Sequence, residues 1–189
     1  MAIIAVVSVF VLIVVSVMAY VGLTRLNGSL STPNVQSLPG GIPCDQLEHS
    51  QVHYHAALQI INQGNSVPIP TGVGRTLACY YWLHMHTGEP GIIHVEAPAD
   101  RTFTLGDFFA VWSAWAGTKE LLDATHVSSF TLTGDQKLMV YVDPGDGAGP
   151  APFSGDPQSI ELKNREVITL EITPPGLTPP PAYSWPPGF

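Results

Sequence analysis

The chain has 189 residues and is acidic, with 15 aspartates and glutamates against 7 lysines and arginines and a formal net charge of −8. Its few basic residues are scattered, which argues against nucleic acid as a partner, because nucleic acids bind clustered basic surfaces. Only 12% of the residues are charged, whereas glycine and proline number 18 each. This composition disfavours a helical bundle and predicts a mainly β fold, an antiparallel sandwich or barrel-like sheet with one or two short helices.

An uncharged, proline-free run opens the chain at residues 2–23. As a helix it is long enough to cross the roughly 30 Å hydrocarbon core of a bilayer, so we expect a transmembrane anchor or uncleaved signal at residues 1–25. A cleaved signal peptide is the main alternative, although no basic region precedes the run. A pilin-like helix that packs into a filament core is a third. We expect the rest of the chain to be membrane-anchored and exposed on the extracytoplasmic side.

Three parts follow the anchor. Residues 26–43 are small, polar and rich in glycine, proline and serine, and therefore predict a flexible linker. Residues 44–173 contain the β-rich segments and form the expected extracytoplasmic domain. Residues 174–189 hold seven prolines and predict a tail that is extended polyproline II or disordered.

Alternating apolar residues and turn signals predict the strands. Val52–Ile61 is the first, and Leu77–His86 is predicted to be a central strand. Gly91–Glu96 is expected to return antiparallel after a turn, which makes a hairpin. Further strands are expected at Val127–Thr133, Lys137–Asp143, Ser159–Leu162 and Val167–Thr173.

One helix is expected after Thr104, which resembles an N-cap because Asp107 follows at the third helical position. Apolar residues at mixed spacings of three and four then form one helical face. They are Leu105, Phe108, Phe109, Val111, Trp112 and Trp115. A second short helix is expected at Lys119–Ala124.

The two cysteines, Cys44 and Cys79, are expected to form a disulfide, since disulfides persist in exported chains. The alternative is that Cys79 is a metal ligand, because its strand also carries His84 and His86. Cys79 is odd-numbered and the histidines are even-numbered, so a regular strand would place them on opposite faces. This parity favours the disulfide.

Three alternating pairs are the strongest functional signal: His53-Tyr54-His55, His84-Met85-His86 and His94-Val95-Glu96. Residues two apart share one face of a strand, so the pairs can bring six donors together. Imidazole and carboxylate are common ligands of zinc, copper and iron, and an exported site favours copper or zinc. The predicted metal ligands are His53, His55, His84, His86, His94 and Glu96. The alternative is a polar groove of histidine–carboxylate hydrogen bonds.

Other candidates are weaker. Glu48 and His49 precede the first pair and could join it, although they are expected in a loop. Met85 is expected to point to the core by strand parity. Glu89 lies in the turn and is expected to be solvated, with a further carboxylate ligand as the alternative. His126 follows a predicted helix end and is expected to be exposed or to cap that helix.

The LHMH run at residues 83–86, GIIHVE at residues 91–96 and FTLGDFF at residues 103–109 resemble the motifs of a group of exported or membrane-anchored archaeal and bacterial proteins. The resemblance covers roughly residues 44–115. This chain departs from the group at Met85 and Thr87, where the group has threonine and aspartate. The resemblance implies a shared site, but no established activity.

The leading functional hypothesis is a membrane-tethered extracytoplasmic protein that handles copper or zinc at its histidine-rich site, in a role that is not catalytic. A metal-dependent enzyme would use the same residues with an open coordination position and a bound water. A structural subunit of a surface filament or a membrane complex is the third hypothesis, with self-assembly or a membrane protein as the partner.

Overall fold

The computed structural model describes residues 38–189. The predicted anchor at residues 1–25 and most of the predicted linker lie outside the described residues. Ile42, at the end of the predicted linker, is fully buried and belongs to the core. Within residues 38–189, none of the helices has the length and apolar character needed to span a bilayer.

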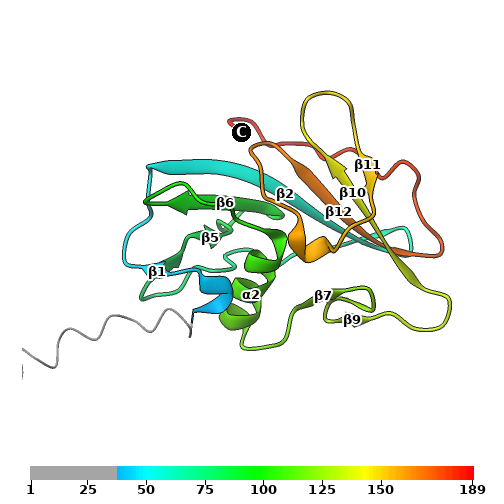
Figure 1. Cartoon of the computed structure of the whole chain (residues 1–189), viewed down its shortest axis with the longest axis horizontal. Helices are drawn as coiled ribbons and strands as arrows, with labels where there is room; N and C mark the ends of the chain where they lie inside the picture. Colours follow the sequence, from blue (N-terminus) through cyan, green and yellow to red (C-terminus); the bar gives the residue numbers. More distant parts are fainter. Residues whose placement is uncertain (1–37) are drawn as a thin grey trace, which may run out of the picture. The chain divides into compact units, whose positions relative to one another are not determined.

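A seven-stranded sheet dominates the fold (Figure 1). Its strand order is β11-β10-β12-β2-β6-β5, and β3 adds to β2. The strands are β2 (Val52–Asn62), β3 (Asn65–Val67), β5 (Leu83–His84), β6 (Ile92–Ala97), β10 (Lys137–Asp143), β11 (Ala151–Phe153) and β12 (Val167–Thr173). The prediction of a mainly β fold is confirmed.

The predicted antiparallel arrangement holds for most of this sheet, but one pair of strands departs from it. Strands β12 and β2 run parallel, with Val167 opposite Ala57 and Ile172 opposite Asn62. The other neighbouring pairs of this sheet are antiparallel. A parallel pair needs a long crossover connection, and here the whole segment between β2 and β12, including the helix, supplies it.

Two smaller sheets complete the β structure. One pairs β1 (Cys44–Asp45) with β4 (Tyr80–Tyr81), and the other has the order β7-β8-β9. The strands of the second are β7 (Leu121–Asp123), β8 (His126–Ser128) and β9 (Phe130–Thr131).

Two predicted elements near these sheets are wrong. The second short helix at Lys119–Ala124 is absent, because Leu121–Asp123 pairs with β8 as a strand. The predicted strand at Ser159–Leu162 is reduced to a single bridge between Thr104 and Glu161.

Helix α2 (Leu105–Ala116) begins where the sequence predicts. The Thr104 side chain accepts a hydrogen bond from the Asp107 amide, and the Asp107 carboxylate accepts one from the Thr104 amide. These two bonds form a capping box. The helix ends at Gly117, whose φ of 68° is the left-handed conformation that glycine adopts readily.

The core lies between α2 and one face of the large sheet. Alternate residues of β2 (Ala56, Leu58 and Ile60) are buried against this core, together with Phe108 and Val111 of α2. Because side chains alternate along a strand, the intervening residues, the histidines among them, point to the opposite face.

The proline-rich tail runs along that opposite face (Figure 1). The Gln59 side chain of β2 donates a hydrogen bond to the carbonyl of Pro181 at 3.2 Å. The Arg165 guanidinium lies 5.1 Å from the centroid of the Trp185 ring. Residues 174–189 therefore make specific contacts with the sheet.

The Cys44–Cys79 disulfide is confirmed. The predicted central strand Leu77–His86 is wrong, because its first residues form a turn and its later residues form two short strands, of which β5 lies at the edge of the large sheet. Leu77 is fully exposed, and the Thr76 hydroxyl accepts hydrogen bonds from the amides of Ala78 and Cys79 in a tight turn. After this turn the chain pairs first with β1 as β4, and then with β6 as β5. The predicted hairpin between the last residues of this segment and β6 is confirmed.

Candidate metal centre

Strand β6 carries His94 and Glu96 between two strands that carry other histidines. On one side, β2 places His55 opposite His94 and His53 opposite Glu96. On the other side, β5 places His84 opposite His94. Because residues two apart on a strand share one face, the five side chains meet on the face of the sheet away from α2.

His84 is fully buried, and its ring orientation is determined by the backbone. Its Nδ1 lies 2.8 Å from the carbonyl oxygen of Tyr81. A carbonyl only accepts hydrogen bonds, so Nδ1 carries the proton of the neutral ring and Nε2 presents its lone pair to the cluster. Backbone bonds of this kind orient metal-ligating histidines.

Nε2 of His84 lies 3.0 Å from Nε2 of His86, which follows the end of β5. Two nitrogens that each bind one ion at about 2.1 Å are about 3.0 Å apart at a right angle and about 3.4 Å apart at a tetrahedral angle. The two rings therefore have the spacing of two ligands of one ion.

A second pair comes from β2, where the Nε2 atoms of His53 and His55 are 3.1 Å apart. Oε1 of Glu96 lies between the two pairs, 3.4 Å from Nε2 of His53 and 3.8 Å from Nε2 of His84. The His94 ring also lies between them, with centroid distances of 4.4 Å to His55 and 5.4 Å to His84.

Two further glutamates join the cluster from loops. Oε1 of Glu48 is 3.4 Å from Nε2 of both His84 and His86. Oε2 of Glu89 is 2.8 Å from Nε2 of His94. The sequence indicates both glutamates only weakly, because neither Glu48 nor Glu89 belongs to a predicted strand. The signal for Glu89 is its position in the turn directly after His86.

Burial determines the protonation state of the cluster. It lowers the pKa of His84 and of His55 to about 4 and also lowers the pKa of His86. Burial opposes the ionisation of Glu96, but a hydrogen bond with His94 and the charge of His84 outweigh it and lower the pKa of this carboxyl. At neutral pH, His55, His84 and His86 are therefore neutral and the Glu96 carboxyl is ionised, which is the state that metal binding requires.

The tail covers one edge of the cluster. The ring of Phe189 meets the ring of His55 edge-on, with centroids 4.8 Å apart. The Tyr183 hydroxyl lies 3.5 Å from the carbonyl oxygen of Pro90, in the loop before β6. The contact with Phe189 limits the access of water to His55, whereas His53 is exposed.

The remaining histidines and Met85 lie apart from the cluster. His49 is 2.8 Å from Asp45, and His126 is 3.0 Å from Asp123. Met85 is fully buried in the core, as strand parity predicts.

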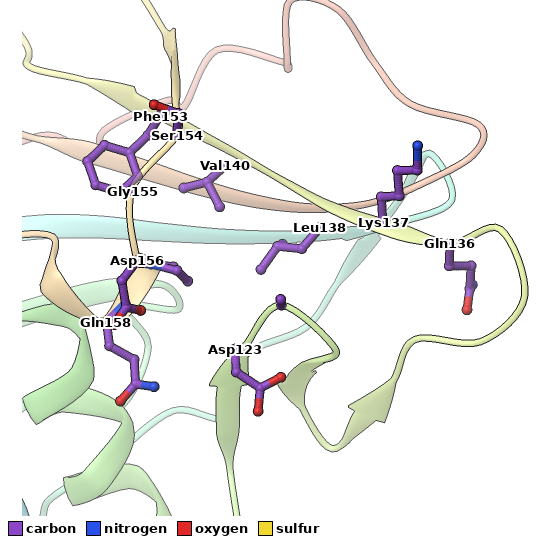
Figure 2. A pocket seen from close by; sticks show the side chains of 12 residues that line it. Asp123, Gln136, Lys137, Leu138, Val140, Phe153, Ser154, Gly155, Asp156 and Gln158 are labelled. Carbon is purple, nitrogen blue, oxygen red and sulfur yellow. The ribbon is translucent and has the colours of Figure 1, made fainter.

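A cavity of about 590 Å³ lies away from the histidines, beside β10 and β11 (Figure 2). Leu138, Val140 and Phe153 provide its apolar wall, and Asp123 and Asp156 lie at its other side. No histidine or cysteine lines it, so its residues do not resemble a transition-metal site.

The donor atoms of the five histidines and Glu96 fall into two sets, and within each set all atoms are within 4.8 Å of one another. One set contains His84, His86, His94 and Glu96, and the other contains His53, His55 and His94. Both combine imidazoles, with a carboxylate in the first and no thiolate in either. This is a donor chemistry that suits zinc and copper(II).

No family model, curated protein or solved structure matches this chain. The resemblance to exported archaeal and bacterial proteins therefore stays a prediction.

Proposed function

We propose that the protein is a membrane-tethered extracytoplasmic metal-binding protein that handles copper or zinc through its histidine cluster. The observation that carries this proposal is the His84–His86 pair, whose Nε2 atoms are 3.0 Å apart while the Tyr81 carbonyl orients the first ring. The ionised carboxylate of Glu96 adds negative charge beside the pair. A cation bound to this pair would therefore be coordinated by neutral imidazoles, one of them oriented by the backbone, and the negative charge of Glu96 would partly neutralise it.

The packing of α2 supports metal handling over a structural role in a filament. Phe108 and Val111 are fully buried against the protein's own sheet. The helix therefore uses its apolar face within the molecule, and the histidines gather at one place instead of scattering over the surface.

The setting of the protein supports the same proposal. The Cys44–Cys79 disulfide indicates an oxidising, extracytoplasmic compartment. The uncharged run at residues 2–23 supports a membrane tether. Such a compartment favours copper(II) and zinc over ferrous iron.

Metal loading of the tag-free protein tests the proposal. After incubation with copper(II) or zinc and removal of free metal, elemental analysis is expected to find at least one bound ion per chain. The melting temperature is expected to rise, since a ligand at a hundred times its dissociation constant stabilises a protein by about 2.7 kcal/mol. Absence of retained metal, with an unchanged melting temperature for both ions, would rule out the proposed function.

A pair of double variants separates the cluster from general histidine content. His84→Ala with His86→Ala removes two ligands and is expected to weaken metal binding at least about a hundredfold, more than the loss of a single supporting contact. His49→Ala with His126→Ala removes two histidines that lie apart from the cluster. This control is expected to bind metal like the natural protein.

A further inference from the structure

The cluster holds more donor atoms than one ion can bind at the observed spacing. Its two donor sets overlap only at His94, so the pair from β2 and the pair from β5 stay separate. Two donors of one ion are at most about 4.2 Å apart, since each bond is about 2.1 Å long. One ion bound to either histidine pair would therefore leave the other pair unused.

The ring planes show which pair His94 belongs to. His86 and His94 are stacked, with planes 4° apart and centroids separated by 4.0 Å. A metal–imidazole bond lies close to the ring plane, along the nitrogen lone pair, so one ion does not bind two rings that overlap face to face. His84 and His86 are also nearly parallel, at 14°, but their Nε2 atoms are 3.0 Å apart while their centroids are 5.0 Å apart, so these two nitrogens face one another. His94 and His55 instead stand at 84°, with centroids 4.4 Å apart. The planes of these two rings cross, so His94 fits an ion on the β2 side.

Carboxylate oxygens supply further ligands for an ion on the β5 side and for an ion on the β2 side. On the β5 side, Oε1 of Glu48 is 3.4 Å from Nε2 of both His84 and His86, which is the tetrahedral spacing given above. Oε1 of Glu96 faces both sides, at 3.4 Å from Nε2 of His53 and 3.8 Å from Nε2 of His84. A carboxylate in this position can neutralise and bridge two cations.

We propose that the cluster is a two-metal centre bridged by Glu96. Its ligands are His84, His86 and Glu48 for one ion and His53, His55 and His94 for the other. The proposal rests on the proposed function, because it requires that the cluster binds a transition metal, and it adds a second ion with its own ligands.

Zinc stoichiometry tests the number of ions. Equilibrium dialysis of the full chain against zinc, followed by elemental analysis, is expected to give two ions per chain. The double variant His53→Ala with His55→Ala and the double variant His84→Ala with His86→Ala are each expected to retain one. The control His49→Ala with His126→Ala is expected to retain two, and circular dichroism checks that each variant is folded.

Copper(II) binding tests whether the two ions are neighbours, first in the natural protein and then in the variants. In the fully loaded natural protein, electron paramagnetic resonance is expected to show a magnetically coupled pair with a half-field transition. Either double variant is expected to give the uncoupled spectrum of a single copper(II). Glu96→Gln, which keeps the size of the side chain but removes its charge, is expected to weaken binding of the second ion at least tenfold.

The possible failures are distinguishable. If no ion binds, both the proposed function and the two-metal centre are wrong. If the natural protein binds one ion and both double variants lose it, the two-metal centre is overturned and the metal-binding function stands. If two copper ions bind without coupling and Glu96→Gln has no effect, the bridge is overturned.

Discussion

Glu166 is a buried carboxylate whose ionisation opposes folding. Its side chain is 4% exposed, and Oε2 has no hydrogen-bond partner within residues 38–189. Burial raises the pKa of Glu166 from 4.5 to about 7. The folded protein therefore holds this proton more tightly than the unfolded chain does. The stabilisation that protonated Glu166 contributes is fully present below about pH 4.5 and is lost as the pH rises to about 7.

Glu166→Gln is predicted to remove this pH dependence, because the amide does not ionise. Between pH 4.5 and 7, the free energy of unfolding of the natural protein is expected to fall relative to the variant by on the order of 1–3 kcal/mol. Urea unfolding of the metal-free proteins at several pH values measures the difference. Asp135→Asn changes an exposed carboxylate that does not affect the pKa of Glu166 and is the control. A difference that stays constant over this pH range would contradict the prediction.

Single residues also show what the sequence reveals about the site. Strand alternation is a local property, so it predicts correctly that His53 and His55 share a face. Glu48 and Glu89 reach the cluster from loops. The path of such loops depends on contacts that are distant in sequence, in this case the disulfide near Glu48. Residue pattern alone therefore does not predict these two contacts.

The start of α2 is an element whose stability depends on one side chain. Thr104→Ala removes the hydroxyl that accepts a hydrogen bond from the Asp107 amide. It is predicted to cost about 1 kcal/mol, which corresponds to a fall in melting temperature of about 2–4 °C for a chain of this size. Thr102→Ala, two residues earlier and exposed, is the matched control. Equal melting temperatures for the two variants would show that the cap does not stabilise the helix.

Elements with a strong local pattern are the ones that the sequence predicts. The strands Lys137–Asp143 and Val167–Thr173 have the predicted bounds, because β-branched and apolar residues make up most of each. The run Val127–Thr133 has a similar composition but is divided into two antiparallel strands by a tight turn at Ser128, whose φ is 55°. The position of this turn depends on tertiary packing, and composition does not indicate it.

At the scale of the whole molecule, the pairing of β12 with β2 is the feature that local patterns cannot predict. The apolar alternation of either strand fits a parallel or an antiparallel neighbour equally well. The order of the sheet instead follows from the path of the intervening chain, which places α2 on one face. The candidate metal site depends less on the pairing of β12 with β2, because its histidines lie on β2, β6 and β5, which are antiparallel neighbours.

The Cys44–Cys79 disulfide is predicted to stabilise the whole domain, because it closes a loop with a sequence separation of 35 residues. The chain-entropy model gives roughly 3–4 kcal/mol for a loop of this length. Replacing both cysteines by alanine is therefore expected to lower the free energy of unfolding in urea by this amount. Reduction of the natural protein is expected to give the same loss by an independent route, which guards against an effect of the alanines themselves. A change below about 1 kcal/mol by both routes would show that the β1–β4 contacts hold this segment in place without the covalent bond.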